Sequence, residues 1–174
     1  MTMREYIEAE IERNGPIPFS RYMQLCLYGE PGSPPGFYTR SQEQFGKAGD
    51  FYTSSDVHAV YGRLLARQFE QMWRALDAPP QLTIVELGPG RGLFAADVLD
   101  WASRKFPDFD RALSYAFVET SASLRGRLVQ RFAEKPQVTI HETIAEAFAH
   151  SSDHVIVFAN EFFDALPTEI LDHR

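Results

Sequence analysis

An acidic residue and three alternate glycines in residues 84–92 have the spacing of a loop that holds a nucleotide-type cofactor. The segment reads Ile-Val-Glu-Leu-Gly-Pro-Gly-Arg-Gly, and its key positions are Glu86, Gly88, Pro89, Gly90 and Gly92. Glycine lets the backbone approach a ligand closely, and the start of a helix offers free N–H groups. A Gly-Pro-Gly run is also a common tight turn. The apolar run before it and the helical pattern after it favour a cofactor loop.

The residue after the third glycine separates two possible cofactors. The dinucleotide fingerprint has Gly or Ala where this chain has Leu93. The spacing therefore favours S-adenosylmethionine, and an NAD-linked oxidoreductase is the less favoured alternative. We expect the methionine end of the cofactor over Gly88–Gly92, with Glu86 ordering its cationic amino group directly or through water.

A second acidic residue, Glu119, ends the next predicted strand. A carboxylate at that point accepts hydrogen bonds from both hydroxyls of a ribose. The alternative is a solvated acid at the positive end of the helix predicted over 121–133. We favour ribose binding, because the first strand already directs a ligand to this edge of the sheet.

Asn160, Glu161 and Asp164 follow the fourth predicted strand, in a turn that borders both cofactor and substrate in this topology. A helical turn would put Glu161 and Asp164 on one face, where paired carboxylates hold a guanidinium or an amine. Alternatively, Asn160 caps a short helix and the two acids favour its positive end. We expect Glu161 and Asp164 to be catalytic and Asn160 to lie at the cofactor. Aromatic candidates for the walls of the site are Phe51, Tyr52, Phe162 and Phe163.

Strands and helices alternate from residue 82 onwards, which predicts an α/β sheet of the Rossmann-like type with strand order 3-2-1-4. Strands are expected over 82–87, 114–118, 138–140 and 154–159, helices over 92–105, 121–133 and 143–149, and a break at Pro107-Asp108. The fourth strand is apolar on both faces, as a central parallel strand is. It would be an open edge in this order, so we expect a missing C-terminal region or a second copy of the chain to cover it.

The first 80 residues are predicted to form a helical extension to the cofactor-binding domain, 81–174. Helices are expected over 4–13, over 20–28 with Ser20 as N-cap and a largely buried apolar face, and over 56–77. A proline- and glycine-rich loop covers 31–36, and an aromatic, glycine-rich segment follows to residue 54. In the third helix Val60 and Leu64 belong to the apolar stripe and Glu70 lies off it.

Composition excludes several classes of function. The chain has 174 residues and a net charge of −7 without a basic block, so nucleic acid is not an expected partner. The single cysteine, Cys26, leaves no internal disulfide, and the five histidines lack metal-ligand spacing, so no metal is expected. No apolar run suits a membrane span, and the acidic N-terminus resembles neither a signal nor a transit peptide. We expect a cytoplasmic protein.

Three segments together resemble the MidA-type methyltransferases, a family that includes the mitochondrial complex I assembly factor that methylates an arginine. They are Gly49-Asp50-Phe51-Tyr52-Thr53-Ser54, residues 85–92, and Ala159-Asn160-Glu161-Phe162-Phe163-Asp164-Ala165-Leu166-Pro167. The resemblance implies a class I fold that binds S-adenosylmethionine through Gly88, Gly90, Gly92 and Glu119. It also implies protein arginine as substrate beside Asn160–Asp164. Members of the family continue beyond the position of Arg174, so later strands are expected to be absent from this chain.

The expected function is methyl transfer from S-adenosylmethionine to a protein side chain, with arginine as the candidate. The alternative is an assembly factor or scaffold that binds the cofactor without turnover.

Overall fold

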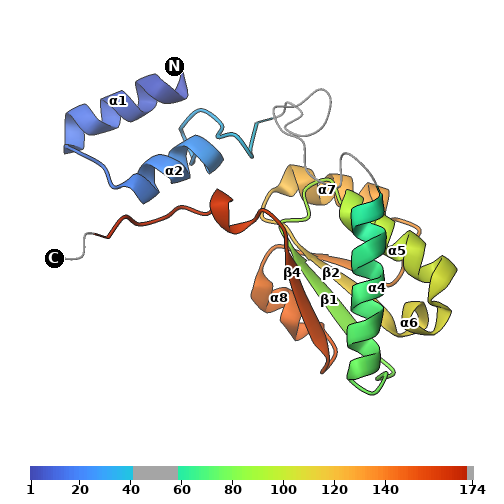
Figure 1. Cartoon of the computed structure of the whole chain (residues 1–174). Helices are drawn as coiled ribbons and strands as arrows, with labels where there is room; N and C mark the ends of the chain where they lie inside the picture. The colour runs from blue at the N-terminus through green and yellow to red at the C-terminus, as the bar shows by residue number, and fades with distance from the viewer. Residues whose placement is uncertain (41–58, 172–174) are drawn as a thin grey trace. The chain divides into compact units, whose positions relative to one another are not determined.

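The computed structural model of the chain describes residues 1–40 and 59–171 (Figure 1). These residues form two compact units, one of 1–40 with 161–171 and one of 59–160. The segment 49–54, with Phe51 and Tyr52, lies outside the described residues.

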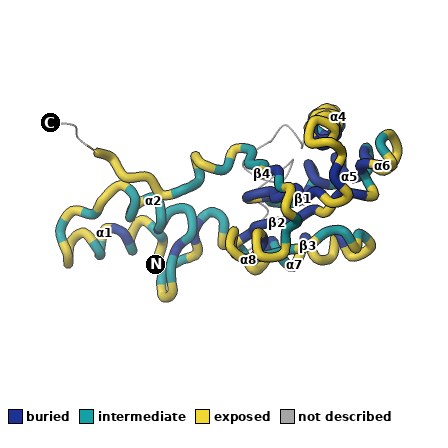
Figure 2. The backbone as a smooth tube through the Cα atoms, turned by 90° about the horizontal axis from the view of Figure 1, so that it is seen from below, coloured by how far each residue is buried: buried dark blue, intermediate teal, exposed yellow. Residues whose placement is uncertain are grey.

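The larger unit contains a four-stranded parallel sheet made of β1 (Leu82–Leu87), β2 (Leu113–Val118), β3 (Val138–His141) and β4 (Val155–Ala159). The spatial order is β3-β2-β1-β4, which confirms the predicted topology. β1 is buried along its whole length, as expected for a central strand between two parallel neighbours (Figure 2). The carboxyl ends of all four strands therefore meet at one edge of the sheet.

Helices cover both faces of this sheet. They are α4 (Val60–Ala75), α5 (Leu93–Lys105), α6 (Pro107–Ala112), α7 (Ala122–Arg131) and α8 (Ile144–Ala149). Side chains from α4 to α6, with Leu128 of α7 and Phe132 just after it, share one core with the sheet, and α8 lies across the sheet from α4 (Figure 1). α5 ends at Lys105, as expected. Pro107 and Asp108 were expected as a break but begin α6, because proline is accepted in the first turn of a helix, where its missing N–H needs no partner.

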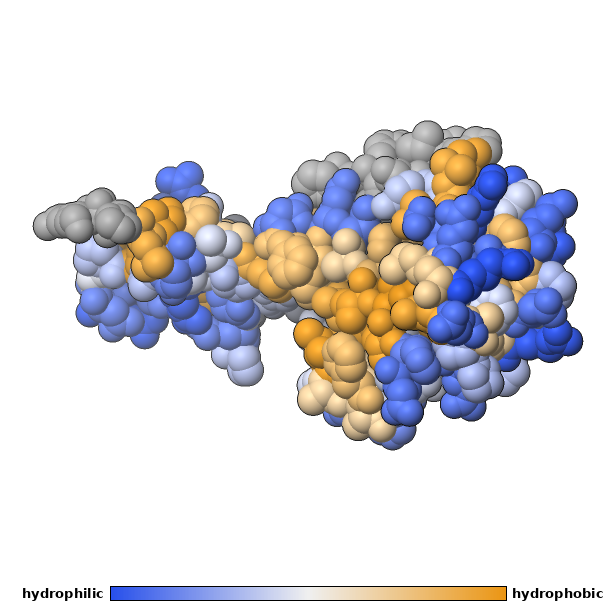
Figure 3. Space-filling model, turned by 60° about the horizontal axis from the view of Figure 1, so that its bottom comes forward, coloured by the Kyte–Doolittle hydropathy of each residue, from blue (hydrophilic) through white to orange (hydrophobic). Residues whose placement is uncertain are grey.

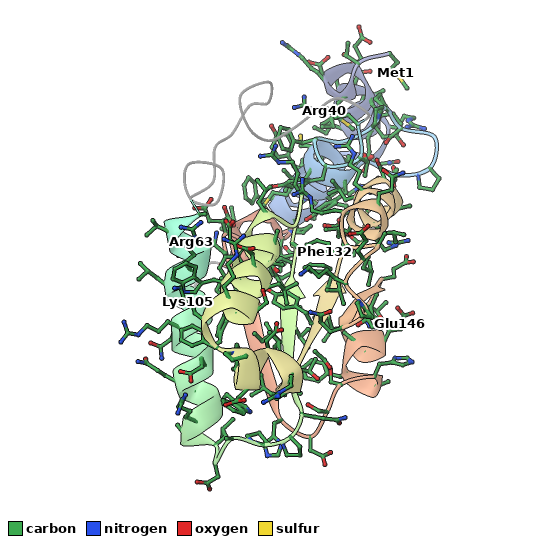
Figure 4. All side chains as sticks on the ribbon, turned by 90° about the vertical axis from the view of Figure 1, so that its right-hand side faces the viewer. Met1, Arg40, Arg63, Lys105, Phe132 and Glu146 are labelled. Atoms are coloured by element: carbon green, nitrogen blue, oxygen red, sulfur yellow. The ribbon has the colours of Figure 1, made fainter. Side chains whose placement is uncertain are left out.

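α4 packs along α5 in the larger unit, although the sequence assigned it to the extension; the boundary near residue 80 stays a prediction. The two helices approach closely at Gly62, where a Cβ atom would lie 2.5 Å from Cβ of Asp97. Farther along, the guanidinium of Arg63 and the amino group of Lys105 lie over the Trp101 ring (Figure 4).

The predicted apolar stripe of α4 is partly wrong. Val60 and Leu64 are exposed, whereas Glu70 is 5% exposed and forms an ion pair with Arg74. Phe69 and Trp73 do face the core, as expected. Helical spacing identified the core side of the helix, but a long acid can be buried when a basic residue one turn away neutralises it.

β4 is an edge strand among the described residues, as the sequence predicted, since it pairs only with β1. Val157 on β4 is 51% exposed, and Phe148 on the neighbouring α8 is 44% exposed. Hydrophobic side chains gather on this unit's surface (Figure 3). What covers this edge stays a prediction.

The smaller unit contains α1 (Met3–Asn14), α2 (Phe19–Tyr28) and the 3₁₀ turn η1 (Phe163–Ala165). Arg21 of α2 forms ion pairs with Glu10 and Glu30. The N-cap prediction is wrong, since α2 begins after Pro18 and the Ser20 hydroxyl bonds Glu169 instead. The largely buried face expected for α2 is also wrong, because Leu25 is its only buried residue and Cys26 is half-buried.

Candidate functional site

The loop between β1 and α5 has the backbone that its glycines predict. Gly88, Gly90 and Gly92 have φ values of 64°, 54° and 70°. The Gly88 N–H donates to the carbonyl of Val118 at 3.0 Å, which ties the loop to the end of β2. The Gly92 N–H donates to the carbonyl of Pro89 at 2.9 Å and closes the turn.

Gly92 is required for two reasons that do not involve a ligand. Its left-handed φ is unfavourable for residues with a side chain. A Cβ atom there would also lie 2.7 Å from Cε2 of Phe132 and 2.8 Å from Cδ2 of Leu128. Phe132, labelled in Figure 4, fills the space between this loop and Phe117 of the sheet. The third glycine therefore packs the loop onto the segment that includes α7, and its role toward a cofactor stays a prediction.

Glu86 is a buried carboxylate at the carboxyl end of β1, 5% exposed. The hydroxyl of Tyr115, on the adjacent β2, donates to its Oε2 at 2.8 Å. Burial raises the pKa of Glu86 to about 7, and the Tyr115 hydrogen bond opposes the rise. Near neutral pH this side chain therefore exchanges between a neutral form and a charged form that favours a cation.

Glu119 is the second buried carboxylate at this edge of the sheet, 8% exposed. The Ser121 N–H donates to its Oε1 at 2.8 Å, and its own N–H donates to the carbonyl of His141. Burial raises the pKa of Glu119, and the Ser121 hydrogen bond and the charge of Arg125 oppose the rise. The alternative of a solvated acid is wrong, because this carboxylate is largely excluded from water.

Arg125 of α7 holds the turn that carries Glu119. Its Nη1 donates to the carbonyls of Glu119 at 2.9 Å and Thr120 at 2.7 Å. Its Nη2 forms an ion pair with Glu142, just after β3. One side chain thus links the ends of β2 and β3, and the carboxylate of Glu119 is presented from a fixed backbone.

Asn160 directly follows β4. Its Oδ1 accepts a hydrogen bond at 3.0 Å from the hydroxyl of Tyr61 on α4. The ring of Tyr61 packs on Phe94, so this hydroxyl is held in place by the core. The alternative in which Asn160 caps a short helix is wrong, because the N-cap of η1 is Phe162.

Glu161 and Asp164 belong to the smaller unit, and both are exposed. The expected helical turn that would pair them is wrong, because η1 begins after Glu161 and Glu161 has a φ of 46°. Asp164 raises the pKa of Tyr38 through its charge, after the larger effect of burial. Their catalytic roles stay predictions.

The described residues contain no group of three or more His, Cys, Asp or Glu side chains that could hold a metal ion. In the same part of the chain, no helix is long and apolar enough to cross a membrane.

Three residues of this site were missed by the sequence analysis: Tyr61, Tyr115 and Arg125. Each acts through a neighbour on another element. Arg125 alone had a sequence signal, a basic residue six positions after an acid at a strand end. The other two depend on the strand register and on the packing of α4.

Comparison with known proteins identifies a family of methyltransferases. Residues 64–173 match a family model described as "Putative S-adenosyl-L-methionine-dependent methyltransferase". A Drosophila melanogaster protein named "Protein arginine methyltransferase NDUFAF7 homolog, mitochondrial" is 32% identical over 98% of this chain and 42% of its own length. The Mus musculus protein of corresponding name is 36% identical over 56% of this chain and 21% of its own.

A solved structure of a superfamily member from Burkholderia thailandensis, bound to S-adenosyl-homocysteine, is similar with a TM-score of 0.72 and 31% identity. The match covers 95% of this chain and 42% of that one, so the chain spans less than half of these longer relatives. The family model covers more than half of the residues, with the glycine loop and both buried carboxylates among them. The chain belongs to this family of S-adenosyl-L-methionine-dependent methyltransferases.

Proposed function

We propose that this chain binds S-adenosylmethionine at the carboxyl ends of β1 and β2 and serves methyl transfer to an arginine of a protein. The observation that carries the proposal is the pair of buried carboxylates, Glu86 and Glu119, at the ends of two adjacent parallel strands beside a positive-φ glycine loop. Buried carboxylates need a cation or hydrogen-bond donors as partners, and a cationic nucleoside with ribose hydroxyls supplies both. The residues present therefore fit this cofactor.

Each residue has a distinct task in the proposal. The bound cofactor supplies a methyl group on a positively charged sulfonium. Glu119 accepts hydrogen bonds from ribose hydroxyls, and Glu86 receives the ammonium of the methionine end. Gly88 and Gly90 allow close backbone approach, and the first turn of α5, which has no side-chain cap, offers N–H groups to the carboxylate of the methionine end.

The acceptor side of the proposal rests on the turn after β4. Glu161, with Asp164, orients the guanidinium and favours its nucleophilic form. In the larger unit, the Tyr61 hydroxyl holds Asn160 at the end of β4. The positive φ of Glu161 supports a functional role, since strained backbone of this kind gathers at active sites. Relatives named protein arginine methyltransferases support arginine as the acceptor.

A second candidate is a scaffold that binds the cofactor without turnover. The exposure of Glu161 and Asp164, and their separation from a shared helical turn, favour it. In that case the buried carboxylates act in binding alone.

Calorimetry with S-adenosylmethionine and S-adenosyl-homocysteine, followed by transfer of labelled methyl groups to proteins of a cell extract, tests both candidates. Transfer that Glu161→Gln lowers about 100-fold or more, at unchanged cofactor affinity, supports the enzyme. The matched control is Glu134→Gln, at an exposed acid of the larger unit. Binding without transfer supports the scaffold, and absence of binding contradicts both.

The place in the cell and the partners complete the proposal. The relatives are named mitochondrial, so a cytoplasmic location stays a prediction for this chain. A protein substrate suits the family, while a second copy or a further segment over β4 stays an expectation.

A further inference from the structure

Tyr115 is a buried polar residue that the proposed function does not use. It is 0% exposed on β2, and its hydroxyl donates to the Glu86 carboxylate at 2.8 Å. The strand register places it opposite Ile84, so the ring lies on the same face of the sheet as Glu86 and reaches it diagonally. Phe117, opposite Glu86, packs against Tyr115, with 5.3 Å between the two ring centroids, and limits the movement of the Tyr115 ring.

Of the residues that β2 and β4 place around Glu86, Tyr115 is the one that makes a polar contact with its carboxylate. β4 places Phe158 opposite Glu86. On α4 the buried acid Glu70 is paired with Arg74, and on α5 Asp97 lies against Gly62. Glu146 of α8 bonds the backbone of its own N-terminus. Among these described groups, the Tyr115 hydroxyl therefore orients the Glu86 carboxylate and opposes the rise in its pKa that burial causes.

We propose that Tyr115 is the positioning residue for cofactor capture: its hydroxyl orients the Glu86 carboxylate for the ammonium group of the methionine end and favours the charged form of the carboxylate over the neutral one. The inference rests on the proposed function. It adds that capture is coupled to proton loss, because a cation favours the ionised carboxylate while burial favours the neutral one. Since the pKa of Glu86 is about 7, the empty site is mostly protonated below neutral pH and its affinity rises as pH increases.

The test is the affinity for S-adenosyl-homocysteine between about pH 5.5 and 9, measured by calorimetry on the full chain. Removing the hydroxyl with Tyr115→Phe keeps the ring in the core and removes the hydrogen bond that favours the charged carboxylate. We expect the midpoint of the affinity curve to rise by about one pH unit, with affinity approaching that of the unsubstituted chain at the alkaline end. Glu119 titrates in both proteins, so the difference between them isolates Glu86.

The controls separate positioning from general damage. Tyr6→Phe removes a tyrosine–glutamate hydrogen bond of the same 2.8 Å length in the smaller unit and should leave the midpoint unchanged. Glu86→Gln should remove the part of the pH dependence that Tyr115→Phe shifts, and adding Tyr115→Phe to it should shift nothing further. Binding to the unsubstituted chain near pH 6.5 should release about 0.7 proton, seen as a dependence of the binding enthalpy on the buffer. This measurement needs no variant.

An unchanged midpoint in Tyr115→Phe, or binding without proton release near pH 6.5, overturns the inference and leaves the proposed function standing. Absence of binding to the unsubstituted chain at every pH overturns the proposed function itself.

Discussion

Replacing Glu86 by glutamine should stabilise the empty protein, and more strongly at high pH. The Glu86 carboxyl has a pKa of about 7 in the native state, against an ordinary value of 4.5. The native state therefore binds this proton more tightly than the unfolded chain, and stability falls as pH rises from 4.5 to 7. The gap of about 2.5 pH units corresponds to a loss of about 3 kcal/mol, of which about 1 kcal/mol is already present at pH 5.

Glutamine has nearly the same shape and still offers an oxygen to the Tyr115 hydroxyl, but it does not ionise. The gain in unfolding free energy of Glu86→Gln should therefore grow by about 2 kcal/mol between pH 5 and pH 8.5. Denaturant titration followed by tryptophan fluorescence measures it. Both tryptophans, Trp73 and Trp101, lie in the larger unit, so the signal reports the unfolding of the unit that holds Glu86.

The matched control is Glu134→Gln, at an exposed acid of the same unit, whose effect should be the same at both pH values. An equal effect of Glu86→Gln at the two pH values would show that the carboxyl is solvated or paired with a cation in the native state. A variant less stable than the parent at pH 8.5 would refute the reasoning as well.

Three further predictions concern packing, the sheet edge and the second carboxylate. Gly92→Ala should lower the unfolding free energy by about 2 kcal/mol or more, since a Cβ at this positive φ meets the side chains of Leu128 and Phe132. Gly126→Ala, with open space around it in α7, should raise the unfolding free energy by about 0.5–1 kcal/mol in the same denaturant titration. Ile156→Ala should lower the unfolding free energy by about 2–4 kcal/mol, because Ile156 is buried. Val157→Lys, on the exposed side of β4, should change the unfolding free energy by less than about 0.5 kcal/mol and reduce self-association in sedimentation. Equal losses of stability in the two variants would contradict the assignment of β4 as an edge strand. Glu119→Gln should weaken S-adenosyl-homocysteine binding about tenfold in calorimetry, and an unchanged dissociation constant would remove it from the site.

The sheet was predictable from sequence because its signals are local. The bounds of β1 follow from an apolar run that ends at an acid and a glycine, and the open β4 edge follows from the strand order. α6 was missed because a proline was taken as a break, although a helix accepts it in its first turn. In α4, Val60 and Leu64 are exposed. Helical spacing shows which face of a helix is apolar, but it does not show how much of that face the neighbouring elements cover.

The site was predictable in part. The buried carboxylates were found because each ends a strand, which is a position in the sequence. The turn after β4 was harder: Glu161 and Asp164 have helical spacing, but the positive φ of Glu161 places it before the 3₁₀ turn. The contact of Tyr115 with Glu86 needs the register of two strands that lie about thirty residues apart, and no local pattern encodes it.

The chemical identity of Glu86 separates a packing role from a binding role. A side chain at this position that only needed to accept the Tyr115 hydrogen bond could be glutamine, which fills the same space and avoids a buried charge above neutral pH. The acid instead makes the empty fold less stable by about 3 kcal/mol at high pH. What the carboxylate offers and the amide does not is charge, and a buried charge is stabilised most by a cation. The lower stability of the empty protein would then be offset in the complex, where a cationic cofactor at the end of β1 pairs with the carboxylate.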